Sequence, residues 1–234
     1  MGSKAVSLAY LLRRVDYRDN DLLLTFFTQD HGKLVALARG AKRSQKRFGG
    51  CLEPIHTLSI ELASASKERA SLKSVEIVCA RTALVRSLEG LGAAGQALSW
   101  VRFTSQERQP EPRIWHLITE LLDALNSGRQ RPQAIAGFGL QVLEAAGWGL
   151  TLDACAACGL PCPEGRPAYI SAVRGGLVCR GCGGAEPELL LQAEERHSLL
   201  LATRGHGFAT EQNAKIACEL VTAVLSAHAG TPAF

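Results

Sequence analysis

The first 80 residues alternate between apolar and polar positions in short runs that turn-forming residues separate. Leu58, Ile60 and Leu62 fall on one side of such a run, with polar residues between them. The alternation predicts strands over residues 3–13, 21–28, 33–39, 55–62 and 71–79. Without a clear helix between them, these strands indicate a small antiparallel barrel, because closure removes exposed edges. An OB-fold, which commonly binds nucleic acid, and an SH3-like barrel both fit this pattern.

Beyond Arg81 the apolar period becomes helical. The clearest predicted helix covers 113–126, where Ile114, Ile118, Leu122 and their neighbours share one face. Further helices are predicted at 83–106, 133–146, 191–203 and 211–228, around a stretch from 147 to 188 that is rich in Gly, Pro and Cys. The chain is therefore expected to be α+β. Its expected parts are a barrel domain at 1–80, a helical domain at 81–150 and 189–234, and an inserted module at 151–188.

Four cysteines in the inserted module have the spacing of a metal site. Cys155 and Cys158 form one C-x2-C pair, and Cys179 and Cys182 form another after twenty intervening residues. Two-residue gaps let both thiolates of a pair reach one tetrahedral ion, so we predict one structural Zn²⁺ with a closed coordination sphere. An iron–sulfur cluster and disulfides are the less favoured alternatives. Cys162, four residues after Cys158, could replace a ligand.

Positive charge concentrates in the first third of the chain. Residues 1–80 contain 13 Lys and Arg against 8 Asp and Glu, a net charge of +5, whereas residues 81–234 carry −1. Five of the charges lie in one glycine-flanked loop: Arg39, Lys42, Arg43, Lys46 and Arg47. Four more are expected to extend the same surface: Arg13, Arg14, Arg18 and Lys33. This pattern favours phosphate contacts with little base specificity, although a solvated loop is the simpler alternative.

Aromatic residues accompany these charges. Phe26 and Phe27 are adjacent on a predicted strand and must point to opposite faces, so one of them can leave the core. Tyr17 and Phe48 lie beside basic residues, where stacking on an unpaired base is possible. Packing within the barrel is the simpler expectation for each of them.

The sequence offers no catalytic motif. It contains neither a phosphate-binding loop nor a dinucleotide fingerprint, and its six histidines are scattered. Asp16, Asp19 and Asp21 could bind a nuclease metal, but a hairpin turn explains them better. We therefore predict a protein that is not an enzyme and uses no nucleotide cofactor.

No secretory signal or membrane span is evident in the sequence. Eight cysteines without such a signal suggest a reducing compartment. We therefore expect a cytoplasmic protein that does not contact membranes.

The chain resembles the RecO family of bacterial recombination mediators in DNA repair. The resemblance rests on "LLRRVDYRDNDLLLTFFTQDHGKLVALARGAKR", on "SQKRFGGCLEPIHTLSIEL", on the helical middle and on the paired cysteines. It implies an N-terminal OB-fold and a helical domain with a zinc module. It also implies binding of single- and double-stranded DNA, strand annealing, and cooperation with RecR and single-strand-binding protein so that RecA can load. Such a protein would associate with the nucleoid.

A second function class remains open from the residues alone. Basic loops bind RNA and DNA in similar ways, so the same barrel and cysteine module could belong to an RNA-associated structural zinc protein of the translation or transcription machinery.

Overall fold

A computed structural model describes residues 5–63, 70–128, 132–183 and 189–229. The chain forms two compact units, Met1–Arg129 and Gln130–Phe234. Each unit has its own buried apolar core.

The first unit begins with a closed five-stranded barrel. Its strands are β1 (Ala5–Tyr17), β2 (Asp21–Thr28), β3 (Gly32–Ala38), β4 (Thr57–Leu62) and β5 (Ala70–Cys79). Their order is β1-β2-β3-β5-β4, and the β3–β5 pairing is parallel while the other pairings are antiparallel. This Greek-key closure, with a short helix between β3 and β4, is an OB-fold. The prediction of a barrel is confirmed, and the OB-fold is the correct one of the two expected folds.

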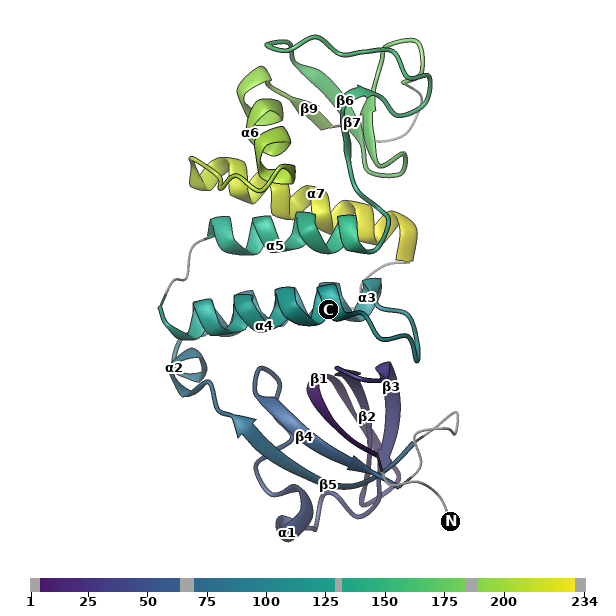
Figure 1. Ribbon diagram of the computed structural model, residues 1–234, viewed down its shortest axis with the longest axis vertical. Helices are drawn as coiled ribbons and strands as arrows, with labels where there is room; N and C mark the ends of the chain where they lie inside the picture. Colours follow the sequence, from purple (N-terminus) through teal and green to yellow (C-terminus); the bar gives the residue numbers. More distant parts are fainter. Residues whose placement is uncertain (1–4, 64–69, 129–131, 184–188, 230–234) are drawn as a thin grey trace. The chain divides into compact units, whose positions relative to one another are not determined.

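The connection between β3 and β4 closes one end of the barrel. It contains the short helix α1 (Gln45–Phe48), and its apolar residues Phe48 and Leu52 belong to the barrel core together with Leu24, Phe26 and Leu58. Figure 1 shows α1 at the end of the barrel opposite the helices that complete the same unit. The basic loop is thus held to the barrel by its own apolar residues.

Three helices complete the first unit: α2 (Thr82–Val85), α3 (Leu88–Thr104) and α4 (Pro112–Asn126). The single helix expected at 83–106 is divided, because the Ser87 side chain accepts a hydrogen bond from Gly90 N and begins a new helix there. Helix α4 packs on the barrel through Trp115, whose ring lies 4.8 Å from that of Tyr10 and 5.9 Å from that of Phe27.

A buried arginine connects the barrel to α4. Arg81 is 1% exposed, and its Nη1 donates to the carbonyl of Ile55 (2.8 Å) and to the hydroxyl of Thr57 (3.0 Å). Its Nη2 lies 2.7 Å from Oδ1 of Asp123 on α4. Since an unpaired buried charge is costly, this network fixes how α4 sits on the barrel.

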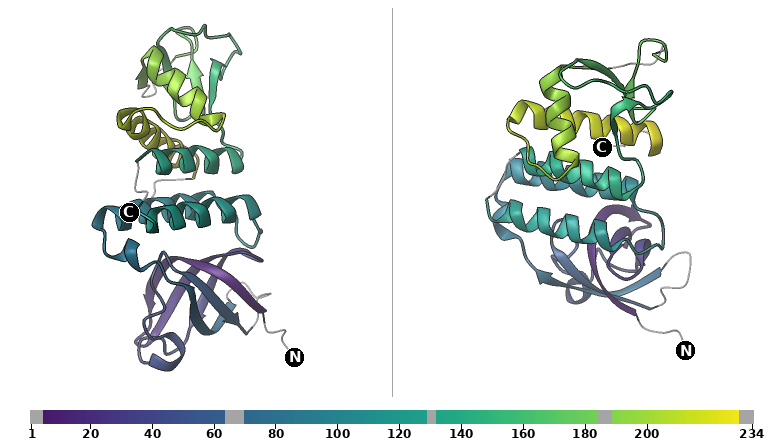
Figure 2. Two further views of the ribbon diagram at one scale, coloured as in Figure 1. Left: turned by 60° about the vertical axis from the view of Figure 1, so that its left-hand side comes forward. Right: turned by 45° about the horizontal axis from the view of Figure 1, so that its top comes forward.

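The second unit combines three helices and a small sheet, seen from two further sides in Figure 2. The helices are α5 (Pro132–Ala145), α6 (Ala193–Thr203) and α7 (Glu211–Ala229), and α5 packs along α7. The strands are β6 (Thr151–Cys155), β7 (Ala168–Ser171), β8 (Gly176–Val178) and β9 (Leu189–Leu191), in the order β6-β8-β7-β9. The Gly- and Pro-rich stretch that carries the cysteines contributes β6, β7 and β8 to this sheet.

The compact units group α2, α3 and α4 with the barrel rather than with α5. The expected domain boundaries near residues 80, 150 and 188 stay predictions.

Candidate nucleic-acid interface and metal centre

The loop that follows β3 is fastened to the β1–β2 hairpin. Gly40 N donates to Oδ1 of Asp21 (2.8 Å), and Lys42 N donates to the carbonyl of Asn20 (3.1 Å). Gly40 has φ +66°, a conformation that glycine adopts without strain. Two segments that carry basic residues thus meet at one end of the barrel.

The five loop charges differ in what they contact. Lys42 Nζ forms an ion pair with Asp16 Oδ2 at 3.0 Å. Arg47 turns back on the loop, donating to the carbonyl of Arg39 (2.8 Å) and to Oγ of Ser44 (3.1 Å). By contrast, the side chains of three exposed residues have no acidic partner within the described parts of the chain: Arg39, Arg43 and Lys46. These three are the most available for an external anion.

Two of the four additional basic residues lie near this loop. Arg18 is in the hairpin turn, with its guanidinium 5.3 Å from the ring centre of Tyr17. Arg14 is exposed and alternates onto the same face of β1 as Asp16, the partner of Lys42. We call Arg14, Arg18, Arg39, Lys42, Arg43, Lys46 and Arg47 the basic end of the barrel.

Arg13 and Lys33 lie elsewhere. Lys33 pairs with Phe27 at the far end of β3, about 20 Å along the strand from Arg39. Its Nζ donates to the carbonyl of Arg102 (2.9 Å), and burial lowers its pKa, which Glu107 partly opposes. Burial lowers the pKa of Arg102, and the nearby positive charge of Arg13 lowers it further. The expected surface is therefore divided, and DNA contact by these two residues stays a prediction.

The aromatic residues are mostly buried. Phe26 and Phe48 belong to the barrel core, while Phe27 points to the other face of β2 and packs under Trp115 of α4. Tyr17 is the one of the four that is only half-buried. Packing therefore accounts for Phe26, Phe27 and Phe48, in agreement with the simpler expectation.

The four paired cysteines converge in the second unit. Their sulfurs all lie within 4.8 Å of one another, and Sγ of Cys158 is 3.8 Å from Sγ of Cys179. A tetrahedral site with metal–sulfur bonds of about 2.3 Å places neighbouring sulfurs about 3.8 Å apart. The geometry fits one metal ion bound by four thiolates. Cys162 is outside the cluster that the described residues form, so the double C-x2-C spacing identified the four cysteines that the fold brings together. Their role as metal ligands stays a prediction.

The protein backbone supports negative charge on this cluster. Backbone N–H groups, foremost that of Cys179 at 3.4 Å, lower the pKa of Cys155 to about 6. Cys182 shows the opposite shift, because hydrogen bonds with the thiols of Cys179 and Cys158 raise its pKa to about 12. Four negative charges on sulfurs within 4.8 Å of one another would repel strongly, so a bound cation would favour the fully deprotonated set.

A second buried arginine holds the cysteine module to α6. The side chain of Arg196 is 4% exposed and donates to four backbone carbonyls, and no carboxylate of the described residues is among its partners. The carbonyls belong to Leu152 (3.0 Å), Cys162 (2.7 Å), Pro163 (2.7 Å) and Arg166 (3.4 Å). Through these bonds a helix outside the module fixes the loop that follows Cys162.

The sequence gives little warning of several of these residues. Arg81 and Arg196 are basic residues whose partners lie far away in the chain, so neither motif nor periodicity marks them. The sequence suggested turn residues or, less favoured, ligands of a nuclease metal for Asp16 and Asp21, whereas both hold the basic loop, through Lys42 and Gly40.

The arrangement defines a class of protein in which an OB-fold barrel with a basic end precedes a helical unit that carries a four-cysteine metal site. Comparisons with known proteins identify the family. Residues 4–81 match the family description "Recombination protein O N terminal", and residues 86–233 match "Recombination protein O C terminal".

Individual relatives agree. "DNA repair protein RecO" of Anaeromyxobacter sp. (strain K) is 38% identical over 228 residues, covering 94% of this chain and 89% of the relative. The proteins of the same name from Geobacter sulfurreducens and Myxococcus xanthus are 37% and 33% identical over 175 residues, covering 75% of this chain and 71% of each relative. The chain belongs to the RecO family of DNA repair proteins.

Within the described ranges, no helix has the length and hydropathy needed to cross a membrane.

Proposed function

We propose that this protein is a non-enzymatic recombination mediator that binds single- and double-stranded DNA through the basic end of its barrel. It anneals complementary strands and, with RecR, helps RecA to load on single-stranded DNA coated by single-strand-binding protein. We place this activity in the cytoplasm, at the nucleoid. Membership in the family supports the role. The observation that carries the DNA site is the basic loop, which is fastened to the hairpin and presents three exposed charges without an acidic partner among the described residues.

The physical basis is neutralisation without a sequence code. Two complementary strands repel each other through their phosphates, and a surface that contacts phosphates lowers this repulsion while the base edges stay free to pair. Because Phe48 is buried and Arg47 is occupied within the loop, we expect ionic contacts rather than base stacking to dominate binding.

A salt series tests the DNA site. We expect the triple variant Arg39→Gln, Arg43→Gln, Lys46→Gln to bind DNA more weakly. Its slope of log affinity against log salt should flatten by about 2 on single strands and about 3 on duplex, because each lost phosphate contact removes about 0.7 or 0.9. The measurement is fluorescence anisotropy with labelled DNA from 50 to 300 mM salt.

The control carries the same charge change in the other unit: Arg166→Gln, Arg174→Gln, Arg180→Gln, three exposed residues of the cysteine module. It should bind as the wild type does. Equal losses in both variants, or none in the loop variant, would mean that the basic end is not the DNA site.

Asp16 offers a test in the opposite direction. The variant Asp16→Asn frees Lys42 from its ion pair and removes a negative charge from the basic end. We expect tighter binding and a slope steeper by about one unit, since one more phosphate contact becomes available. Unchanged affinity in the same anisotropy assay would exclude Lys42 from the interface.

For the metal we propose one structural Zn²⁺ held by Cys155, Cys158, Cys179 and Cys182. Four thiolates leave no position for water or substrate, so the ion contributes folding free energy rather than chemistry. Elemental analysis should find one zinc per chain. Iron, with the visible absorbance of an iron–sulfur centre, would contradict this.

The alternative, RNA association, predicts a different preference. RNA and DNA oligonucleotides of equal length and sequence should compete equally if only phosphates are contacted, and RNA should bind more tightly if the protein serves an RNA complex.

Incubation of the protein and DNA with Mg²⁺ should leave the DNA intact. Degradation that the double replacement of Asp19 and Asp21 abolishes would instead identify a nuclease.

A further inference from the structure

An aromatic ring reaches the surface at the basic end of the barrel. Tyr17, the last residue of β1, is half-buried, and the guanidinium of Arg18 lies 5.3 Å from the centre of its ring. Tyr10 and Phe48, the two other barrel rings that have an arginine beside them among the described residues, are 0% and 3% exposed. Of these three rings, Tyr17 is therefore the one that an external molecule can reach.

Tyr17 lies beside the basic loop. It pairs with Asp21 across the hairpin, and residues directly opposite each other in an antiparallel ladder point their side chains to the same face. Asp21 accepts the hydrogen bond from Gly40 N, the residue that follows Arg39. The ring is thus one cross-strand pair away from the loop whose Arg39 and Arg43 have no acidic partner among the described residues.

The exposed part of the ring has no occupant within the chain. In the ranges that the structure describes, Tyr17 makes no ring contact other than the one with Arg18, and its hydroxyl forms no hydrogen bond. By contrast, Tyr10 packs against Trp115 and its hydroxyl bonds to Thr119. Packing and hydrogen bonding explain the buried tyrosine and leave the exposed one without an internal role.

Arg18 holds a charge against this ring. Its φ of +55° is uncommon for a residue other than glycine, and a guanidinium over a tyrosine ring is a favourable cation–π contact. The ring and the charge therefore form one unit at the end of the hairpin. A base that stacks on the ring brings its own phosphate close to Arg18 and to the loop.

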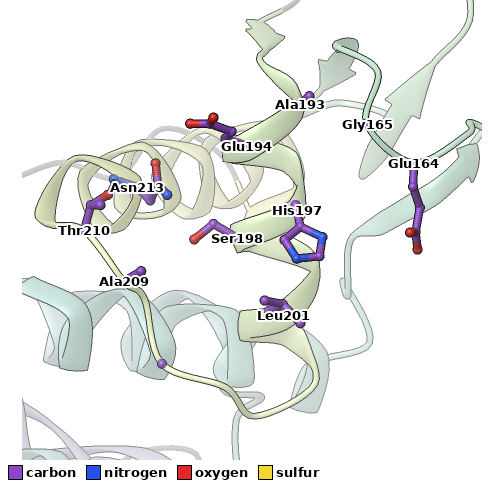
Figure 3. A pocket seen from close by; sticks show the side chains of 11 residues that line it. Glu164, Gly165, Ala193, Glu194, His197, Ser198, Leu201, Ala209, Thr210 and Asn213 are labelled. Atoms are coloured by element: carbon purple, nitrogen blue, oxygen red, sulfur yellow. Dashed lines mark hydrogen bonds between the residues drawn. The ribbon is translucent and has the colours of Figure 1, made fainter.

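A pocket in the second unit shows that a ring alone does not favour a nucleotide. The pocket, of about 470 Å³, is lined by the imidazole of His197 on α6 (Figure 3). Glu164 and Glu194 also line it, and their charge has the same sign as that of a phosphate. The guanidinium of Arg196 is buried, and its donors are used by backbone carbonyls. This pocket repels phosphates, whereas Tyr17 lies beside exposed cations.

We propose that Tyr17 is a base-stacking residue that gives the DNA site a preference for unpaired strands, with Arg18 contacting the adjacent phosphate. The inference rests on the proposed DNA site. Every base has a π-face, so the contact needs no particular sequence. Bases in a duplex stack on one another, so the ring contacts single strands only. Annealing removes this contact, and the paired product is released more readily than the separate strands.

Matched DNA probes test the stacking. They are a labelled single strand, a duplex of the same length, and a single strand of that length in which abasic sites replace the bases. We expect Tyr17→Ala to weaken binding of the base-containing strand about tenfold, the size of one stacked base, with an unchanged salt slope. Its affinity for the duplex and for the abasic strand should equal that of the wild type. The measurement is fluorescence anisotropy over a salt series.

Three further variants separate stacking from charge and from general damage. Tyr17→Phe retains the ring and should bind as the wild type does. Arg18→Gln should flatten the salt slope on both single strands and duplex, because it removes a phosphate contact. Tyr169→Ala, which replaces a 40% exposed tyrosine of the second unit, should leave all three affinities unchanged.

The wild type alone can overturn the proposal, through equal affinity for the base-containing and the abasic strand. Tyr17→Ala overturns it by binding all three probes equally weakly, which would make Tyr17 a support of the loop, or by binding as the wild type does. Failure of the DNA site itself is distinguishable. It appears as unchanged binding of the triple variant of Arg39, Arg43 and Lys46, whereas failure of the stacking leaves the effect of that variant intact.

Discussion

The barrel and the cysteine module reach a defined structure by different means. The barrel buries a continuous apolar cluster, in which Phe26, Leu58 and Ile60 are each fully buried. The module has short strands with few large buried side chains, and it depends on the four cysteines and on Arg196. Stability is therefore spread over many contacts in one region and concentrated in a few polar bonds in the other. The two regions should respond differently to the same kind of perturbation.

Metal removal should have the largest effect and should separate the two regions. We expect chelation to unfold the module while the barrel persists, because structural zinc contributes on the order of 10 kcal/mol to small four-ligand domains. Amide spectra before and after chelation measure this, region by region.

A pair of cysteine variants is the matched control. Cys158→Ser should lose the metal, whereas Cys162→Ser should retain it, since Cys162 is not in the cluster. Metal retention in the first variant or loss in the second would contradict the assigned ligand set.

Replacement of the two buried arginines tests the same contrast between the regions, with a smaller expected effect. Arg196→Lys leaves several buried carbonyls without donors, and each costs about 1–3 kcal/mol, so we expect a loss of about 3 kcal/mol in the second unit. It should also weaken metal binding in a competition with a chelating dye. Arg81→Lys should destabilise the first unit in urea denaturation and leave metal affinity unchanged. A metal effect of Arg81→Lys would show that the regions are coupled.

A smaller, pH-dependent effect is expected in the first unit alone. Burial, with the charge of Arg81, lowers the pKa of His56, whose Nδ1 accepts a hydrogen bond from Arg81 N (3.2 Å). The unfolded chain protonates His56 more readily than the folded chain does. The contribution of neutral His56 to the stability of the first unit is therefore present above about pH 6.5 and is lost as the pH falls below that value.

Replacement of His56 by Asn removes this titration and retains an acceptor. In urea denaturation at pH 8 the wild type should be about 1 kcal/mol more stable than the His56→Asn variant. This difference in the free energy of unfolding should shrink as the pH falls to 5. A constant difference would mean that His56 does not titrate on unfolding.

The same contrast explains which features of the fold and the site could be predicted from the sequence. Alternation located all five barrel strands, and double C-x2-C spacing located the four cysteines that cluster, because both signals are local and repeat at a fixed interval. The roles of Arg81, Arg196 and Asp16 could not be predicted from such signals. Each acts on groups distant in the chain or on backbone carbonyls, and only the folded chain brings these together. Lys33 illustrates the same limit, since its strand was predicted correctly but its neighbours, Arg102 and Glu107, were not.

The anchoring of α1 has a consequence for how the family can diverge. Phe48 and Leu52 hold the loop from inside the barrel, while Arg39, Arg43 and Lys46 lie outside it. Exterior substitutions therefore leave the core packing intact. If the basic end binds DNA as proposed, its affinity can be raised or lowered by point mutation without loss of the fold. A designer could exchange residues 39–47 between relatives, keep the two apolar anchors, and obtain a graded series of binding strengths on one barrel.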